Sequence, residues 1–136
     1  MVWLAVFRRL DRFVTIGAMA RTILIVDDHP SFRATARALL QADGFEVVGE
    51  AEDGASAIEA VARLHPDLVL LDVQLPDMDG FAVAAEIGRP NGSYPDVVLT
   101  SSRDAADFGP LVAESGARGF VPKAELSGAA LRSVLR

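Results

Sequence analysis

The chain contains no cysteine, one tryptophan and one tyrosine, and it lacks both a basic stripe and a long hydrophobic run. Without cysteine, disulfides and thiolate metal sites are excluded. No apolar run approaches the roughly 20 residues that a membrane-spanning helix needs, so no membrane span is expected. Because 13 Lys and Arg face 19 Asp and Glu, for a formal charge of −6, direct nucleic-acid binding is not expected either. A length of 136 residues is enough for one domain.

Two short apolar runs end in carboxylates. Residues 23–26 are followed by Asp27 and Asp28, and residues 68–71 are followed by Asp72. Apolar runs without polar alternation predict strands that are buried on both faces, as in parallel sheets. Because parallel strands point the same way, the three carboxylates are expected to meet at one edge of the sheet. Open α/β sheets place their ligand sites at this edge.

Three crowded carboxylates repel one another and raise one another's pKa unless a cation compensates. An oxygen-only ligand set suits Mg²⁺. Taken singly, Asp72 could merely end a strand or cap a turn, and Asp27 and Asp28 could be an acidic pair at a helix start. These simpler explanations do not account for the convergence of all three carboxylates.

Two further strand ends carry polar groups. Residues 97–100 end in the hydroxyl of Thr100, and residues 119–123 end in the ammonium group of Lys123. Carboxylates, a hydroxyl and an ammonium at neighbouring strand ends suit phosphoryl transfer to Asp72. In this reaction the carboxylate attacks, and the metal and cations hold the phosphoryl oxygens.

These motifs, in this order, resemble the receiver domain of bacterial response regulators. The resemblance depends on the acidic pair at 27–28, the LLDVQLPDMDG block, Thr100 and Lys123, and Asp72 follows Asp27 by 45 residues (72 minus 27). It covers about residues 21–136. We therefore expect a receiver domain at 21–136, preceded by an N-terminal extension at 1–20.

The resemblance assigns roles around the acceptor. It implies that Asp72 is the phosphoacceptor and that Asp28 and Asp72 bind Mg²⁺ directly. Asp27 would help through water or by positioning, and the backbone carbonyl of Gln74 would complete the protein ligands. We expect His29, next to the acidic pair, to be a solvent-facing residue at a helix start rather than a ligand.

The resemblance also implies how phosphorylation is sensed. Thr100 would hydrogen-bond a phosphoryl oxygen, and Lys123 would pair with the acceptor carboxylate and then with the phosphate. Phe120, three residues before Lys123, stands where the family carries its switch aromatic. As isolated residues, these three would be a strand threonine, a solvated lysine and a core phenylalanine.

The family's partners follow from the same resemblance. The phosphoryl donor would be a histidine kinase or a phosphotransfer protein. On phosphorylation the receiver would either act on an output protein or output domain or form a homodimer, and it would be cytoplasmic. It would not be an enzyme, beyond its own phosphoryl transfer and dephosphorylation. The end of the chain at Arg136 fits either a stand-alone receiver or a fragment of a longer regulator.

The alternation of strand and helix patterns predicts a doubly wound α/β fold, with a five-stranded parallel sheet in the flavodoxin-like order 2-1-3-4-5. Helices are expected at 30–41, 54–64, from 81 to before Pro90, from 110 to near 116, and from about 126 to the end. In the second helix, Ile58, Val61 and Ala62 are expected to face inward. Residues 101–109 have no clear periodicity and are expected to be weakly structured.

Residues 1–20 allow two interpretations. Their apolar residues recur at helical spacing, at Trp3, Phe7, Leu10 and Val14. An amphipathic segment of this kind suits docking to a membrane surface or a partner. We favour an extension with little structure, because Met19 would itself be a natural start for the domain.

Three other functions compete with the receiver. An aspartyl-nucleophile phosphatase typically needs a second acid two residues after the nucleophile, where Gln74 stands. A nucleotide-binding module needs a glycine-rich turn after the first strand, but DDHPSF follows there. A scaffold that works without phosphorylation is disfavoured, because the chain has all five residues that the family uses at its site. These are Asp27, Asp28, Asp72, Thr100 and Lys123.

Overall fold

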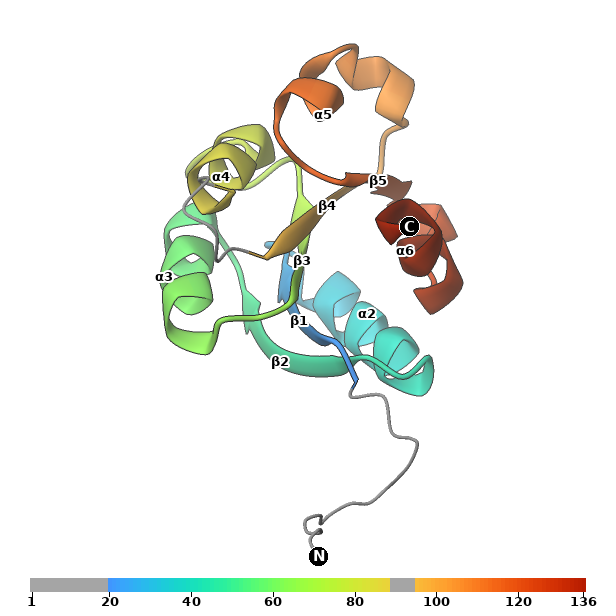
Figure 1. Cartoon of the computed structure of the whole chain (residues 1–136). Coiled ribbons are helices and arrows are strands. Elements are labelled where there is room, and N and C mark those ends of the chain that lie inside the picture. The colour runs from blue at the N-terminus through green and yellow to red at the C-terminus, as the bar shows by residue number, and fades with distance from the viewer. Residues whose placement is uncertain (1–19, 89–94) are drawn as a thin grey trace, which may run out of the picture.

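The computed structural model describes residues 20–88 and 95–136. It contains one five-stranded parallel sheet in the order β2-β1-β3-β4-β5, as predicted (Figure 1). The strands are β1 Thr22–Val26, β2 Glu46–Ala51, β3 Leu68–Asp72, β4 Asp96–Ser101 and β5 Gly119–Pro122. The interpretation of residues 1–19 lies outside the described residues, as do residues 89–94.

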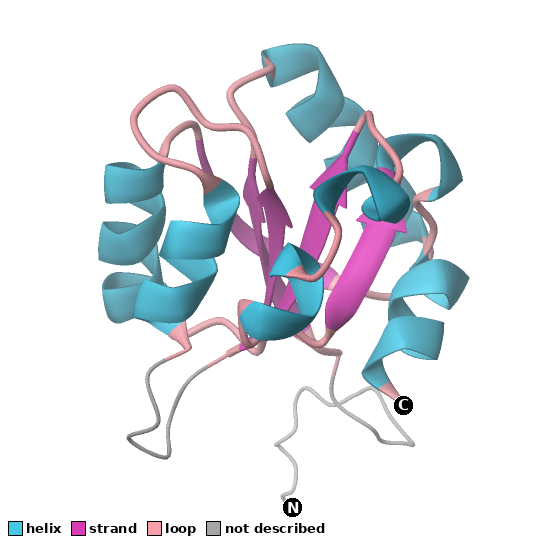
Figure 2. Ribbon diagram, turned by 90° about the horizontal axis from the view of Figure 1, so that it is seen from above, coloured by secondary structure: helices cyan, strands magenta, loops and turns pink. Residues whose placement is uncertain are grey.

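Helices cover both faces of the sheet, as the view from above shows (Figure 2). The α-helices are α2 Pro30–Ala42, α3 Gly54–Leu64, α4 Gly80–Ile87, α5 Leu111–Glu114 and α6 Gly128–Leu135. Two short 3₁₀ helices, η1 Ala105–Phe108 and η2 Lys123–Glu125, complete the described elements. Helices α2 and α6 pack on one face, and α3 and α4 pack on the other.

The two-sided burial explains the unbroken apolar runs. Along β1, Ile25 belongs to the buried cluster that contains Leu40 of α2, whereas its neighbour Val26 belongs to the cluster that contains Ala57 of α3. Successive strand residues point to opposite faces, so a strand that is covered on both sides is apolar at every position. The central strands therefore form the core and present polar groups only where they end.

The inward face of α3 differs from the prediction. Ala62 is exposed, whereas Ala57 and Ala60 are buried, so the prediction for Ala62 was wrong. The Asp53 carboxylate accepts a hydrogen bond from the Ser56 N–H at 2.8 Å, in a capping box that fixes where the helix starts. Small alanines on the inner face let the helix lie close to the sheet.

The last third of the chain is more regular than its sequence indicates. Residues 101–109 include the 3₁₀ helix η1, which is capped by Asp104, and the helix expected from Pro110 is the short α5. Helix α6 begins at Gly128 rather than at about 126. The Ser127 hydroxyl caps it by accepting a hydrogen bond from the Ala130 N–H at 2.9 Å.

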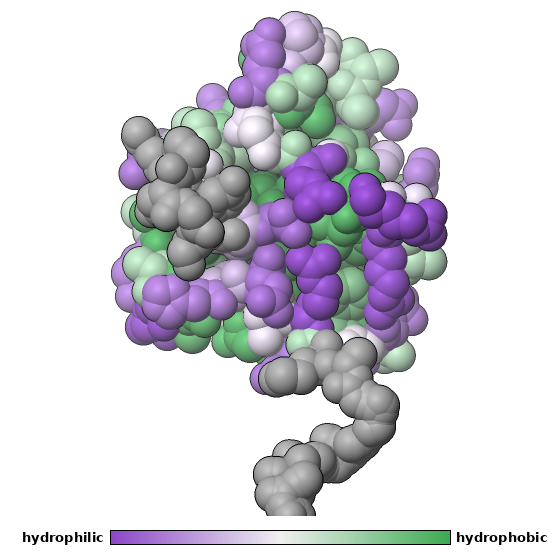
Figure 3. Space-filling model, in the orientation of Figure 1, coloured by the Kyte–Doolittle hydropathy of each residue, from purple (hydrophilic) through white to green (hydrophobic). Residues whose placement is uncertain are grey.

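The surface has mixed polarity. In the orientation of Figure 1, hydrophilic and hydrophobic residues are interspersed over the visible face, including the top around α5 (Figure 3). Leu111 of α5 is 46% exposed. No helix within residues 20–88 and 95–136 is long and apolar enough to cross a membrane.

Candidate functional site

Two carboxylates lie buried at the carboxyl edge of the sheet. Strands β1 and β3 are neighbours at the point where the strand order reverses, and Asp27 follows β1 while Asp72 ends β3. Asp27 is fully buried and Asp72 is 3% exposed. Buried charges need partners, so both carboxylates imply further groups around them.

A cluster of four possible ligands surrounds this edge. One ligand atom each of Asp27, Asp28, His29 and Asp72 lies within 4.8 Å of the others. His29 is the N-cap residue of α2, and its Nδ1 lies 3.0 Å from Asp27 Oδ1 and 3.1 Å from Asp28 Oδ1. The prediction placed His29 in solvent, and its side chain is indeed 65% exposed, but it also contacts both acids of the pair.

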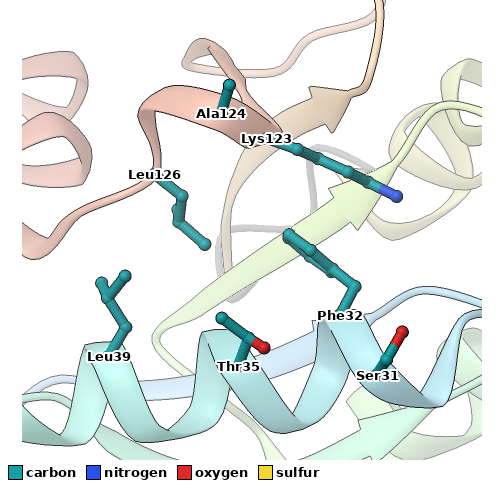
Figure 4. Close-up of a pocket in the computed structure, with 7 residues that line it drawn as sticks. All are labelled: Ser31, Phe32, Thr35, Leu39, Lys123, Ala124 and Leu126. Carbon is teal, nitrogen blue, oxygen red and sulfur yellow. The ribbon is translucent and has the colours of Figure 1, made fainter.

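Lys123, the first residue of η2 directly after β5, closes the site. Its Nζ lies 2.6 Å from Asp27 Oδ2 and 3.2 Å from Asp72 Oδ2, so it bridges the two buried carboxylates. The predicted pairing with Asp72 is present, but the shorter contact is with Asp27. The ammonium group also lies 4.5 Å from the centre of the Phe32 ring, a favourable cation–π distance (Figure 4).

The surroundings separate the two carboxylates electrostatically. Burial, together with the negative charge of Asp27, raises the pKa of Asp72 to about 6, although the Gln74 N–H and Lys123 act in the opposite direction. Burial alone would raise the pKa of Asp27, but the Lys123 ammonium at 2.6 Å and the hydrogen bonds with His29 outweigh it and lower this pKa. Asp27 is therefore the more strongly ionised of the pair and the main counter-ion of Lys123.

The donor set fits a small, hard cation. Asp27 Oδ2 is buried and, although it touches the Lys123 ammonium, it has no hydrogen bond of acceptable direction. Three carboxylates with water access through the partly exposed Asp28 match the oxygen ligands that Mg²⁺ prefers. The Gln74 N–H donates to Asp72 Oδ1 at 3.1 Å, which brings the Gln74 backbone to the site while its side chain stays exposed.

Thr100 lies beside Asp72, but its hydroxyl faces the next strand. Thr100 pairs with Asp72 across β3 and β4, and its Oγ1 donates to the Val121 carbonyl at 2.6 Å. The neighbouring Phe120 is half-buried, with its ring 5.8 Å from that of Phe108. The Phe108 ring in turn lies 5.6 Å from the Phe81 ring, so three aromatic side chains connect β5, η1 and α4.

Two residues that support the site were not predicted from the sequence, Arg33 and Asp77. The Arg33 Nη1 donates to the Asp27 main-chain oxygen at 2.5 Å. The Asp77 carboxylate accepts from the N–H groups of Gly54 and Ala55, which joins the loop after β3 to the start of α3. The signal for Arg33 was present: helical side chains lean toward the helix N-terminus, which directs this residue toward the end of β1.

A groove of about 400 Å³ opens beside Lys123, between α2 and η2 (Figure 4). Its lining consists of Ser31, Phe32, Thr35, Leu39, Lys123, Ala124 and Leu126. The mostly apolar walls lead directly to the ammonium group of the site. A partner that reaches Asp72 from this side would therefore contact α2 and η2.

The fold and the site together define a class of protein: a doubly wound domain with an acidic, lysine-closed site at its switch point. Residues 23–136 match the family described as the response regulator receiver domain. The chain belongs to this family, whose members work in two-component systems, which confirms the resemblance drawn from the sequence.

Relatives agree with this assignment. The DNA-binding response regulator MtrA of Mycolicibacterium smegmatis is 42% identical over 110 residues, which is 79% of this chain and 46% of the relative. The nitrate/nitrite response regulator NarP of Escherichia coli is 40% identical over 102 residues, 74% of this chain and 47% of the relative. The chain spans about half the length of the curated relatives it matches. They are described as regulators, not as enzymes.

Solved structures show the same fold. The receiver domain of the response regulator NarL from Mycobacterium tuberculosis superposes with a TM-score of 0.74 at 36% identity, covering 87% of this chain and 98% of that one. The BeF₃-activated receiver domain of RstA from Klebsiella pneumoniae has a TM-score of 0.70 at 34% identity, covering 85% and 95%.

Proposed function

We propose that this chain is a phosphorylation-controlled receiver that accepts a phosphoryl group on Asp72, in a Mg²⁺-dependent reaction. The donor is a histidine kinase or a phosphotransfer protein. The observation that supports this proposal is the convergence of buried Asp72 and Asp27 with Lys123 at the switch point of the sheet. A structural ion pair would not need a second buried carboxylate that shares the same lysine.

The chemistry follows from these positions. An oxygen of Asp72 attacks phosphorus, an O–P bond forms, and the N–P bond to the donor histidine breaks. Lys123, already 3.2 Å from Asp72, holds the carboxylate in its charged form and then pairs with a phosphoryl oxygen. Asp27, Asp28, Asp72 and the Gln74 carbonyl would hold Mg²⁺, which neutralises charge on the carboxylates and the phosphoryl oxygens.

Thr100 connects the acceptor to the rest of the domain. For its hydroxyl to reach a phosphoryl oxygen, Thr100 must release the Val121 carbonyl to which it donates at 2.6 Å. That release frees β5 next to Phe120, whose ring packs on Phe108 of η1. We propose that phosphorylation reorganises the face formed by η1, α5, β5 and α6.

The reorganised face would bind the output partner or a second copy of the chain. It carries the exposed Leu111, a suitable contact for an apolar surface. The output partner is an output protein or an output domain, and we place the whole pathway in the cytoplasm. We assign residues 21–136 to the receiver and residues 1–20 to an extension.

A phosphatase with an aspartyl nucleophile is the second candidate. Its general acid would stand two residues after Asp72, where Gln74 has an exposed amide side chain that cannot donate or accept a proton at neutral pH. A scaffold independent of phosphorylation would leave the raised pKa of Asp72 and the bridging Lys123 without a role. The receiver accounts for both features.

Labelling by a small phosphodonor tests the proposal. The chain should gain one phosphoryl group from acetyl phosphate with Mg²⁺, seen by intact mass, and none in EDTA or in Asp72→Asn. Phosphoramidate should be used in parallel, because acetyl phosphate can also acetylate Lys123, the only lysine of the chain. Undiminished phosphoryl labelling of Asp72→Asn, or full labelling in EDTA, would disprove the assignment.

A further inference from the structure

Arg33, in the first turns of α2, joins two strands at the edge of the site. Its Nη1 donates to the Asp27 main-chain oxygen at 2.5 Å, and its Nε donates to Glu50 Oε1 of β2 at 2.9 Å. The Arg33 side chain is only 16% exposed. Hydrogen bonds from a guanidinium that is largely shielded from water hold their partners firmly.

The Asp27 backbone is therefore held from two directions. Its N–H donates to the Ala51 carbonyl of β2 at 3.0 Å, and its carbonyl accepts from Arg33. That carbonyl belongs to the planar peptide bond between Asp27 and Asp28. Fixing the plane fixes the direction in which Asp28 and His29 leave the strand, and both belong to the cluster of four possible ligands.

We propose that Arg33 is a positioning residue, which holds the turn from Asp27 to His29 in the geometry that Mg²⁺ requires; this rests on the proposed Mg²⁺-dependent function. Arg33 acts through a main-chain oxygen rather than as a ligand. Mg²⁺ demands near-octahedral coordination at about 2.0–2.1 Å, whereas Ca²⁺ tolerates variable geometry and ligand number. Loss of Arg33 should therefore weaken Mg²⁺ binding more than Ca²⁺ binding.

Arg37 is the matched control for Arg33. It lies one turn later on α2, and its Nε donates to the other oxygen of the same carboxylate, Glu50 Oε2, at 2.7 Å. Replacing either arginine removes one positive charge near the acidic cluster, which alone should tighten the binding of a divalent cation. If Arg33 is a positioning residue, its replacement should instead weaken the binding of the divalent cation, whereas the replacement of Arg37 should not. Electrostatics alone and positioning therefore predict different results.

Calorimetric titration of the full chain with MgCl₂ and separately with CaCl₂ tests the inference. In Arg33→Ala, the Mg²⁺ affinity should fall about 10-fold or more, the usual effect of losing outer support at a metal site. The Ca²⁺ affinity should fall less. Arg37→Ala should bind both ions at least as tightly as the wild type. Arg33→Lys should recover part of the Mg²⁺ affinity, because an ammonium can reach the Asp27 carbonyl without also forking to Glu50.

The outcomes separate the inference from the proposed function. A wild-type chain that does not bind Mg²⁺ contradicts the function and the inference with it. A wild type that binds Mg²⁺, with Arg33→Ala matching Arg37→Ala or losing Mg²⁺ and Ca²⁺ affinity equally, overturns the inference alone. If Arg33→Ala does not fold, as judged by circular dichroism in EDTA, the same comparison is made between Arg33→Gln and Arg37→Gln.

Discussion

Lys123 has two partners, and the closer one is Asp27 rather than the proposed acceptor Asp72. The buried Asp27 carboxylate is 2.6 Å away, and the burial that would lower the lysine pKa is outweighed by Asp27 and Asp72, which raise it. The ammonium group therefore provides the positive charge that compensates the Asp27 carboxylate, which has no exposure to water. A metal ion in the same cluster would take over part of that task.

Replacing Lys123 should produce a loss of stability that Mg²⁺ reverses. Lys123→Met keeps the apolar stem but leaves Asp27 without its cation, so the free energy of unfolding in EDTA should fall by about 3 kcal/mol. Saturating Mg²⁺ should restore most of it. Urea unfolding with and without Mg²⁺ measures this. Arg63→Met, which breaks an exposed pair with Glu59, should change little in either condition. An equal loss with and without Mg²⁺ would contradict the assigned role.

At the scale of elements, α4 starts against the backbone at the end of β3, next to Asp72. The Gly80 N–H donates to the Val73 carbonyl at 2.6 Å. A Cβ at Gly80 would overlap the Asp72 carbonyl oxygen and come within 2.8 Å of Val73 Cα. Only glycine permits this approach, so the glycine of the LPDMDG segment determines how closely α4 can support Asp72.

Two glycine replacements should differ for this reason. Gly80→Ala should lower the free energy of unfolding by about 2 kcal/mol, because backbone atoms must move to relieve the overlap. The Cβ of Gly54→Ala, also at the first residue of a helix, would meet only side chains: the flexible Met78, which can rotate away, and Val83 Cγ2 at 3.0 Å. This replacement should change stability little in urea titrations. Equal stability of the two variants would contradict this view of the acceptor loop.

The switch elements can be tested with a phosphoryl mimic. Beryllofluoride with Mg²⁺ should shift amide resonances at residues 101–109 and Phe120 as well as around Asp72. In Thr100→Val, the distant shifts should vanish while those near Asp72 persist, because the hydroxyl that leaves Val121 is missing. Ser102→Ala serves as the control, because Ser102 is exposed and lies only two residues after Thr100. Distant shifts that survive in Thr100→Val would exclude this route.

At the scale of the whole molecule, a second ionic cluster links several elements at the opposite edge of the sheet, where β4 begins. Asp96 at the start of β4 accepts from Arg21 at 2.9 Å and from Arg118 at 3.0 Å. Arg118 also donates to the Leu135 carbonyl near the end of α6 at 2.7 Å. Burial would raise the pKa of Asp96, but the two guanidinium groups outweigh it and lower this pKa from its usual 3.8.

This cluster should make stability depend on pH. Because the Asp96 pKa is lower in the folded state, its stabilisation is complete well above pH 3.8 and is lost as the pH falls through the lower folded value. At pH 7, Asp96→Asn should be about 1 kcal/mol less stable than the wild type, since the pairs are partly exposed. That difference should shrink as unfolding is measured at progressively more acidic pH. A constant difference would contradict the ionic origin, and Glu59→Gln should show almost none.

The sequence by itself determined the order of elements and the polar groups at the strand ends. Unbroken apolar runs, helix caps and turn residues are local signals, so residues 23–26 and 68–71 predicted buried parallel strands before any contact was known. Parallel strands bring their carboxyl ends together by geometry, and Asp27, Asp72 and Lys123 could therefore be grouped from sequence. The 3₁₀ helix within 101–109 left no such periodic signal.

Only the tertiary structure decided which of these groups touch. Lys123 lies closer to Asp27 than to Asp72, the Thr100 hydroxyl donates to Val121, and Arg33 holds the Asp27 carbonyl. Each contact joins elements that are distant along the chain or turned by packing. The direction of a side chain in such a contact depends on the position and the rotation of each helix on the sheet. A rotation of less than one turn is enough to change the contact. Ala62 illustrates the same limit, because α3 turns Ala57 and Ala60 toward the core and leaves Ala62 exposed.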